Sequence, residues 1–259
     1  MEQELRGRVA VITGAGSLRG IGFATAQVFA RESATVVLTD INPSRPQHNV
    51  SLLQKMGCKA IEVVADVSSK PDVDRLFRTV LEEYGRIDIL VNNAGITQSV
   101  STERMTETDW DRMLRINLRS QYLCSQAVLP EMVNQKWGRI VCVSSVAGRG
   151  GPSFGSAHYA AAKAGIIGFA QSLAKEMAQH GITVNVVAPG SIDTDILLGK
   201  KRWDGFRVEE LREMRIERIP MKRFGAAQEV AEVIAFLSSG RASYITGAVV
   251  DVNGGLHMC

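Results

Sequence analysis

The sequence predicts an α/β protein in which a parallel sheet of about seven strands is covered by helices on both faces, a doubly wound arrangement. Short runs of β-branched residues alternate with longer helical patterns along the whole chain. The strand runs are apolar almost throughout, as expected for strands buried on both faces. No linker, repeat or low-complexity stretch interrupts this pattern. We therefore expect residues 1–259 to form one domain, with an irregular excursion at about 191–223.

The individual elements follow from periodicity and from the residues that end each run. The expected strands are 9–13, 34–40, 59–67, 87–95, 138–145, 182–190 and 247–255. The expected helices are 20–33, 51–57, 72–85, 109–136, 159–180 and 226–238. The pattern over 72–85 is typical, because its apolar residues share one helical face and a glycine ends the run. Single helices between strands imply right-handed crossovers and a parallel sheet.

Bulk properties exclude several classes of protein. A chain of 259 residues buries enough surface to fold without disulfides, and its net charge of +3 is too small for a nucleic-acid-binding face. Its four cysteines and four histidines are scattered, without the paired spacing of a metal site. The N-terminus is no signal peptide, and no apolar run approaches the ~20 residues of a membrane span. We expect a cytoplasmic protein with no metal, nucleic-acid or membrane partner.

The first candidate site is the turn "TGAGSLRGIG" (13–22), which follows the first strand and opens a helix. Glycines let the backbone turn sharply, so that a pyrophosphate can approach the free N–H groups at the helix N-terminus. The alternative is a tight turn whose glycines only pack the helix against the sheet. The position in the first βα unit favours a dinucleotide. The candidate cofactor-binding residues here are Gly14, Ser17, Arg19, Gly20, Ile21 and Gly22.

The end of the second strand bears on the choice of dinucleotide. Asp40 lies where the adenosine ribose is expected, and its carboxylate would accept hydrogen bonds from both ribose hydroxyls and repel a 2′-phosphate. Arg19 argues the other way, since a guanidinium beside the turn can pair with that phosphate, and Arg45 could do the same. The strand fixes Asp40 in place, whereas an arginine can swing into solvent. The sequence therefore favours NAD over NADP.

The stretch "SAHYAAAKAG" (156–165) places Tyr159 and Lys163 four residues apart, hence on one helical face. A free tyrosine has a pKa near 10, and a neighbouring ammonium would favour the phenolate. The alanines between the two residues leave room for a cofactor against the helix. Taken alone, the pair is also compatible with an ordinary helix surface.

The motifs in combination resemble the short-chain dehydrogenase/reductase family over essentially the whole chain, which implies a Rossmann-type fold. They occur in order: T-G-x(5)-G-I-G, "NNAG" (92–95), "SS" (144–145), "YAAAK" (159–163), "APG" (188–190) and "VNGG" (252–255). The resemblance implies that Tyr159 is the catalytic acid or base and that Lys163 lowers its pKa and holds the nicotinamide ribose. It also implies that Ser145 binds the substrate oxygen and that Asn117 supports a water relay. The further cofactor contacts implied are Asp66, Val67, Asn93, Gly95, Pro189, Gly190, Ile192 and Thr194.

Two departures from the family pattern leave alternatives open. Five residues separate the first glycine of the turn from G-I-G where the family usually has three, a spacing similar to that of enoyl-thioester reductases. Those enzymes pair Tyr and Lys at Y-x(6)-K, so the Y-x(3)-K found here favours carbonyl and alcohol chemistry. The longer turn puts the role of Arg19 in doubt. Ser145 is preferred as the catalytic serine, with Ser144 as the alternative.

Other residues carry weaker hypotheses. His158 adjoins Tyr159 but faces about 100° away on a helix, so we expect a structural role for it. Trp110 and Trp137 are expected to pack rather than to bind substrate. The excursion carries many charges, which are either a solvated helix face or, at 200–202, a site for an anionic substrate.

The leading functional prediction is an oxidoreductase that moves a hydride between NAD(H) and a secondary alcohol or ketone. Candidate substrates are a sugar, a polyol or an anionic hydroxy compound. The alternative within enzymes is an NADPH-dependent 3-oxoacyl-thioester reductase, acting on acyl carrier protein or coenzyme A. A third hypothesis is a non-catalytic protein that senses the nucleotide. The family resemblance also implies a homotetramer.

Overall fold

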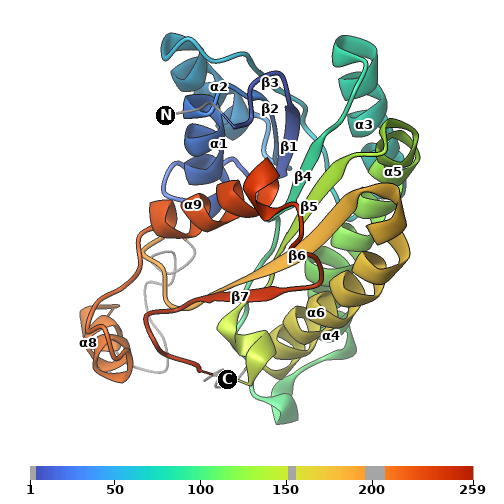
Figure 1. The fold of residues 1–259 in the computed structure, drawn as a ribbon. Coiled ribbons are helices and arrows are strands. Elements are labelled where there is room, and N and C mark those ends of the chain that lie inside the picture. The colour runs from blue at the N-terminus through green and yellow to red at the C-terminus, as the bar shows by residue number, and fades with distance from the viewer. Residues whose placement is uncertain (1–3, 151–155, 196–207, 259) are drawn as a thin grey trace.

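A computed structural model describes residues 4–150, 156–195 and 208–258, and it contains a seven-stranded sheet in the order β3-β2-β1-β4-β5-β6-β7 (Figure 1). Every neighbouring pair of strands is parallel. The strands are β1 (Val9–Thr13), β2 (Thr35–Thr39), β3 (Ala60–Glu62), β4 (Ile89–Asn92), β5 (Gly138–Val143), β6 (Ile182–Pro189) and β7 (Val249–Val252). The predicted fold class is confirmed.

The helices form two layers, one on each face of the sheet (Figure 1). One core cluster packs under α1 (Ile21–Arg31), α2 (Ser44–Lys55) and α9 (Ala227–Ser238). The other packs under α3 (Lys70–Tyr84), α5 (Ser120–Gln135) and α6 (Ala157–Met177). The remaining long helices are α4 (Glu107–Leu114) and α8 (Val208–Arg218). Among the described residues, no helix is long and apolar enough to cross a membrane.

The strand order reverses direction at β1, whose two neighbours are β2 and β4. The connections after β1 and after β4 therefore leave toward opposite faces and open a crevice at the carboxyl ends of the strands. The glycine turn follows β1, the segment from residue 93 follows β4, and the two serines follow β5. The topology thus brings the predicted site residues to one edge of the sheet.

Several boundaries differ from the sequence prediction. Pairing in β3 stops at Glu62, although the apolar run continues to Val67. Helix α2 begins at Ser44 rather than at 51, because Pro46 is tolerated in a first helical turn. The region 109–136 is a helix interrupted by a π-helical turn at Arg115–Arg119. Residues 200–202, proposed as a site for an anionic substrate, lie outside the described residues.

A buried carboxylate links several chain segments at the opposite edge of the sheet, where the strands begin. Asp88, just before β4, is fully buried and accepts hydrogen bonds from Arg8, from both Nε and Nη2 of Arg86, and from the N–H of Val9, all at 2.6–2.9 Å. Burial alone would raise the pKa of Asp88, but these donors together hold it below its ordinary value. Charge-assisted hydrogen bonds to Asp88 therefore link the start of β1 to the start of β4.

Replacing Asp88 with asparagine is expected to lower the free energy of unfolding by about 2 kcal/mol at pH 7, because the charge-assisted bonds are lost. The pKa of Asp88 is depressed in the folded state. Its contribution is therefore complete above the unfolded-state value of ~3.9 and disappears as the pH falls through the folded-state value. Urea unfolding at pH 7 and at about pH 3.5 measures the free energy of unfolding of the parent and of Asp88→Asn. The difference between the two proteins should be smaller at the lower pH.

The matched control is Asp74→Asn on α3, where an exposed carboxylate pairs with Lys70. This change should move the free energy of unfolding by no more than about 0.5 kcal/mol. If Asp88→Asn and Asp74→Asn lost the same free energy of unfolding, the role given to Asp88 would be contradicted.

Candidate active site

Tyr159, Lys163 and Ser145 meet at the carboxyl end of β5. Tyr159 lies in the first turn of α6 and Lys163 lies one turn later, with its Nζ 5.6 Å from the centre of the tyrosine ring. The Ser145 side chain, just after β5, lies beside the Tyr159 hydroxyl, close enough to lower the pKa of that phenol. The Lys163 ammonium is buried and donates to the carbonyl of Val143 at 2.9 Å. Two hydroxyls and a cation thus converge, as a site that binds and protonates an oxygen atom needs.

Burial shifts the two titrating groups in opposite directions. It raises the pKa of the Tyr159 phenol above its ordinary value, while the neighbouring Ser145 side chain acts the other way. It lowers the pKa of Lys163 to about 8, against a small opposing effect of the neighbouring Cys142 thiol. The sequence predicted that Lys163 lowers the pKa of Tyr159. In the chain by itself the dominant effect is burial, so the tyrosine is a neutral phenol at pH 7.

The two consecutive serines have different positions. Ser144 is buried, and its hydroxyl donates to the backbone carbonyl of Lys163 at 2.7 Å. Ser145 is partly buried; its Oγ accepts from the N–H of Ala147 at 3.2 Å and contacts Tyr159. Ser145 therefore lies beside the tyrosine, whereas Ser144 holds α6 against the end of β5.

Asn117 is held in the π-helical turn between α4 and α5. Its amide Nδ2 donates to the carbonyl of Met113 at 3.1 Å, and its Oδ1 accepts from the N–H of Ile96 at 3.2 Å. π-Helical turns of this kind are frequent at functional sites. A Cβ on Gly95 would lie 2.5 Å from Asn117 Oδ1 and 3.6 Å from Lys163 Nζ. The structure thus brings Asn117, Gly95 and Lys163 together, and only glycine fits between the two side chains.

The glycine turn packs directly on the segment after β4. Gly14 has φ +64°, and a Cβ there would come within 2.6 Å of the Ala94 backbone. Asn93 Nδ2 donates to the carbonyls of Thr13 and Gly14 at 2.8 and 3.0 Å. Helix α1 then begins after Gly20 with no side chain capping it. Its first N–H groups remain available to an anion, so the turn fits the pyrophosphate of a dinucleotide.

Asp40 lies at the end of β2 beside the same turn. Its two carboxylate oxygens accept from the backbone N–H groups of Gly16 and Asn42 at 3.0 and 3.1 Å. A Cβ on Gly16 would lie 2.6 Å from this carboxylate and 2.9 Å from the Cβ of Arg45. Asp40 is therefore fixed in orientation, and Arg45 extends from the adjacent exposed position.

Asp66 and Val67 follow β3 next to Asp40. The N–H of Ala65 donates to the Asp40 carbonyl at 3.2 Å, which aligns the two chain segments. Asp66 Oδ1 accepts from the N–H and hydroxyl of Ser68, and Val67 is buried. These residues can form the far wall of an adenosine site.

The segment after β6 approaches the glycine turn from the other side. Pro189 ends β6, Gly190 follows it, and Ile192 and Thr194 are buried. Two carboxylates that the sequence analysis did not single out attach this segment to the turn. Asp195 accepts from Ser17 at 2.5 Å, and Asp193 pairs with Arg19 at 3.2 Å and with Arg212 of α8 at 2.9 Å. Arg19 thus contacts a carboxylate, and its predicted contact with a cofactor stays a prediction.

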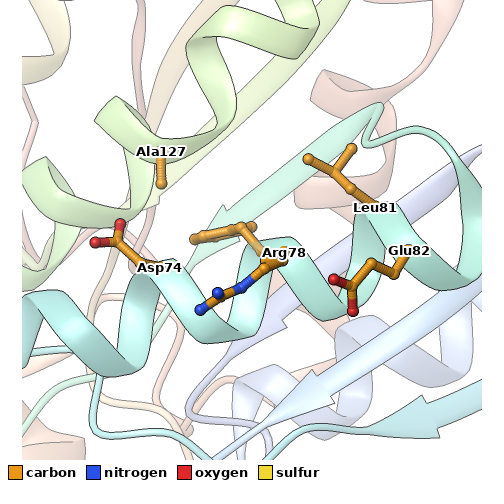
Figure 2. Close-up of a pocket in the computed structure, with 6 residues that line it drawn as sticks. Asp74, Arg78, Leu81, Glu82 and Ala127 are labelled. Atoms are coloured by element: carbon orange, nitrogen blue, oxygen red, sulfur yellow. The ribbon is translucent and has the colours of Figure 1, made fainter.

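Two further features lie away from this site. A groove of about 450 Å³ lies against α3 and α5 and shares no residue with the predicted site. It is lined by Asp74, Phe77, Arg78, Leu81, Glu82 and Ala127, which Figure 2 draws as sticks. Trp137 stacks between the guanidinium groups of Arg8 and Arg139, 3.7 and 4.4 Å from its ring centre. Its predicted packing role is what the structure shows. In the described part of the chain no cluster of three or more His, Cys, Asp or Glu side chains could hold a metal.

Comparison with known proteins gives matches over nearly the whole chain. A family described as Enoyl-(Acyl carrier protein) reductase matches residues 14–257. The 3-oxoacyl-[acyl-carrier-protein] reductase FabG of Thermotoga maritima is 43% identical over 253 residues, covering 97% of this chain and 98% of that protein. The protein of the same name from Aquifex aeolicus is 42% identical, covering 99% and 100%.

A solved structure agrees with these sequence matches. A protein from Burkholderia xenovorans, assigned to the short-chain dehydrogenases/reductases, superposes with a TM-score of 0.94 at 34% identity. The superposition covers 98% of this chain and 97% of that one. The chain therefore belongs to the short-chain dehydrogenase/reductase family and is an NAD(P)-dependent oxidoreductase of that family.

Proposed function

We propose that this protein reduces the ketone of a 3-oxoacyl thioester to the 3-hydroxyacyl thioester. The observation that carries the proposal is the placement of Tyr159 next to Ser145 and beside the buried Lys163. Two hydroxyls that meet at one point suit a substrate oxygen on which negative charge develops during reduction. The names of the relatives, matched over 97% and more of this chain, favour an acyl thioester over the sugar or polyol that the sequence alone placed first.

The reaction follows from what each residue can do. Ser145 holds the ketone oxygen, and Tyr159, a neutral phenol, donates its proton to that oxygen as the carbon is reduced. The nicotinamide, when bound, supplies the hydride. Lys163 and Asn117 then return a proton toward Tyr159 through a water relay. Reduction of a carbon–carbon double bond, as the description of the matching family would suggest, makes less use of two hydroxyls at one oxygen.

The residues of the cofactor cleft support NAD(H) rather than NADP(H). Asp40 is fixed by the N–H groups of Gly16 and Asn42, so its charge stays beside the expected ribose. A 2′-phosphate placed there would meet a carboxylate at short range, with Arg45 as its available counter-charge. The glycine turn would hold the pyrophosphate, and Ile192 and Thr194 would hold the nicotinamide end.

We also propose that the protein is a homo-oligomer, with the tetramer as the form that the family resemblance implies. Trp110 of α4 and Tyr122 of α5 are 39% and 44% exposed, which is high for large aromatic side chains. Phe169 of α6 packs edge to face against Tyr122. These helices therefore present aromatic surface to a second copy.

Assay of a substrate panel tests the proposed function. With NADH, a 3-oxoacyl thioester is expected to react with a kcat/KM at least about 100-fold above that of the matching enoyl thioester. Polyols and sugars with NAD⁺ serve as the comparison. Turnover of polyols alone would overturn the thioester assignment. Tight NADH binding with no turnover of any substrate would instead indicate a nucleotide sensor.

Removing the phenol hydroxyl tests the proton donor. Tyr159→Phe should lower kcat by about 10²- to 10⁴-fold, because the substrate oxygen loses its acid. The dissociation constant for NADH, measured by calorimetry, should stay within about twofold of the parent value. Tyr244→Phe, which removes the hydroxyl of a fully exposed tyrosine, is the matched control and should leave kcat unchanged. A Tyr159→Phe protein as fast as its parent would contradict the mechanism.

Neutralising Asp40 tests the cofactor assignment. Asp40→Asn keeps an acceptor for the N–H of Gly16 but removes the charge, so NADPH should bind about tenfold tighter relative to NADH. Adding Arg45→Ala should cancel much of that gain if Arg45 pairs with the phosphate. Dissociation constants from calorimetry measure both effects. A parent protein that already prefers NADPH would overturn the assignment of NAD(H).

A further inference from the structure

The two ends of the Tyr159–Lys163 pair are anchored in different ways. Lys163 is held three times: its ammonium donates to Val143, its backbone carbonyl accepts from Ser144, and Gly148 packs against its backbone. Tyr159 lies in the first turn of α6, which begins at Ala157. First turns lack part of their helical hydrogen bonds and depend on outside partners to stay in place. Something else must therefore fix the tyrosine end of the helix.

The N-terminal cap of α6 does not fix the tyrosine end of the helix. The N-cap residue, Ser156, makes no side-chain capping hydrogen bond to α6. Its hydroxyl instead donates to the backbone carbonyl of Gln98, at 3.2 Å, in the segment after β4. The start of the catalytic helix is thus attached sideways, to a segment that borders the same crevice.

A chain of side chains makes a second attachment at the same place. His158, fully buried, lies with its Nε2 3.4 Å from Gln98 Oε1. Gln98 Nε2 donates to Asp109 Oδ1 at 2.6 Å. Asp109 is also the third residue of α4 and completes the capping box of that helix with Thr106. His158, Gln98 and Asp109, named here the brace, therefore join the first turns of α4 and α6 through the segment after β4.

Donors and acceptors in the brace allow a single arrangement. A carboxylate only accepts, so the amide nitrogen of Gln98 must face Asp109 and its oxygen must face His158. His158 then needs a proton on Nε2 to donate. Burial lowers the pKa of His158, which leaves the imidazole neutral near pH 7 with its single N–H directed at Gln98. The orientation of each side chain is fixed by the next.

We propose that His158, Gln98 and Asp109 are positioning residues that hold the first turn of α6 so that the Tyr159 hydroxyl stays against Ser145. This inference rests on the proposed role of Tyr159 as proton donor. The brace acts on Tyr159 through the first turn of α6. Misplacing a reacting group by about 1 Å can lower a rate about 100-fold, so a small movement of this turn suffices to matter.

The brace should affect catalysis without affecting cofactor binding. The glycine turn and Asp40 are held to each other by the N–H of Gly16, and Lys163 keeps its own three anchors. Loosening the first turn of α6 therefore leaves the dinucleotide site intact. A merely structural role would lower stability and activity together, with no separation of kcat from cofactor affinity.

Gln98→Met is the primary test, because it keeps the size of the side chain, removes both of its hydrogen bonds and leaves the backbone bond to Ser156. We expect kcat to fall about 10- to 100-fold while the dissociation constant for NADH stays within about twofold. Hydrogen exchange of the Ala160 amide, which donates to the Ser156 carbonyl in this first turn, should be faster than in the parent. Parent-like kcat and parent-like exchange would overturn the proposal.

Three further variants separate the brace from general effects. Thr106→Val weakens the α4 cap but keeps the bond between Gln98 and Asp109, so it should leave kcat near the parent value. His158→Phe should resemble Gln98→Met, and His158→Gln, which can still donate to Gln98, should recover much of the rate. Combining His158→Phe with Gln98→Met should add little to either change alone. Full additivity would contradict a shared brace.

The hydrogen-exchange result does not depend on the substrate. If no substrate is turned over by the parent, the proposed function fails while faster exchange in Gln98→Met still supports the brace. If the parent reduces 3-oxoacyl thioesters and Gln98→Met does so equally fast, the proposed function stands and the brace fails.

Discussion

A buried ammonium group is the constraint around which the rest of the site is arranged. Lys163 lies on a helix packed into the core, and an unpaired cation there would be very unfavourable. Its donor is directed at the Val143 carbonyl, at the end of the strand that leads to Ser145. Glycine at position 95 leaves space for the Asn117 side-chain oxygen beside this ammonium. Placing this one cation fixes the relation between β5, α6 and the segment after β4.

The segment after β4 connects the two halves of the site. Asn93 bonds to the glycine turn, the N–H of Ile96 bonds to Asn117, and Gln98 bonds to the start of α6. Six consecutive residues thus contact the cofactor turn, the region of the lysine and the catalytic helix in turn. These polar contacts hold the course of the segment. Its sequence sets the geometry on both sides of the crevice.

The sequence predicted the fold and indicated most of the candidate site residues, because both depend on local patterns at strand ends. The glycine turn, the apolar strands and the tyrosine–lysine spacing are all readable within a few residues. The family resemblance favoured Ser145 over Ser144, but local sequence does not show which of the two hydroxyls lies beside Tyr159. The same holds for His158, whose partner Gln98 is sixty residues away. The π-helical turn at Asn117 was also missed, because the apolar pattern continues through it.

The protonation states of the pair bear on the direction of the reaction. Burial favours the uncharged form of every group, so it raises the pKa of the Tyr159 phenol and lowers that of the Lys163 ammonium to about 8. At pH 7 the pair is therefore a neutral phenol beside an ammonium that is still mostly charged. That combination can donate a proton, which reduction of a ketone requires. Oxidation of an alcohol would need the phenolate, which burial disfavours.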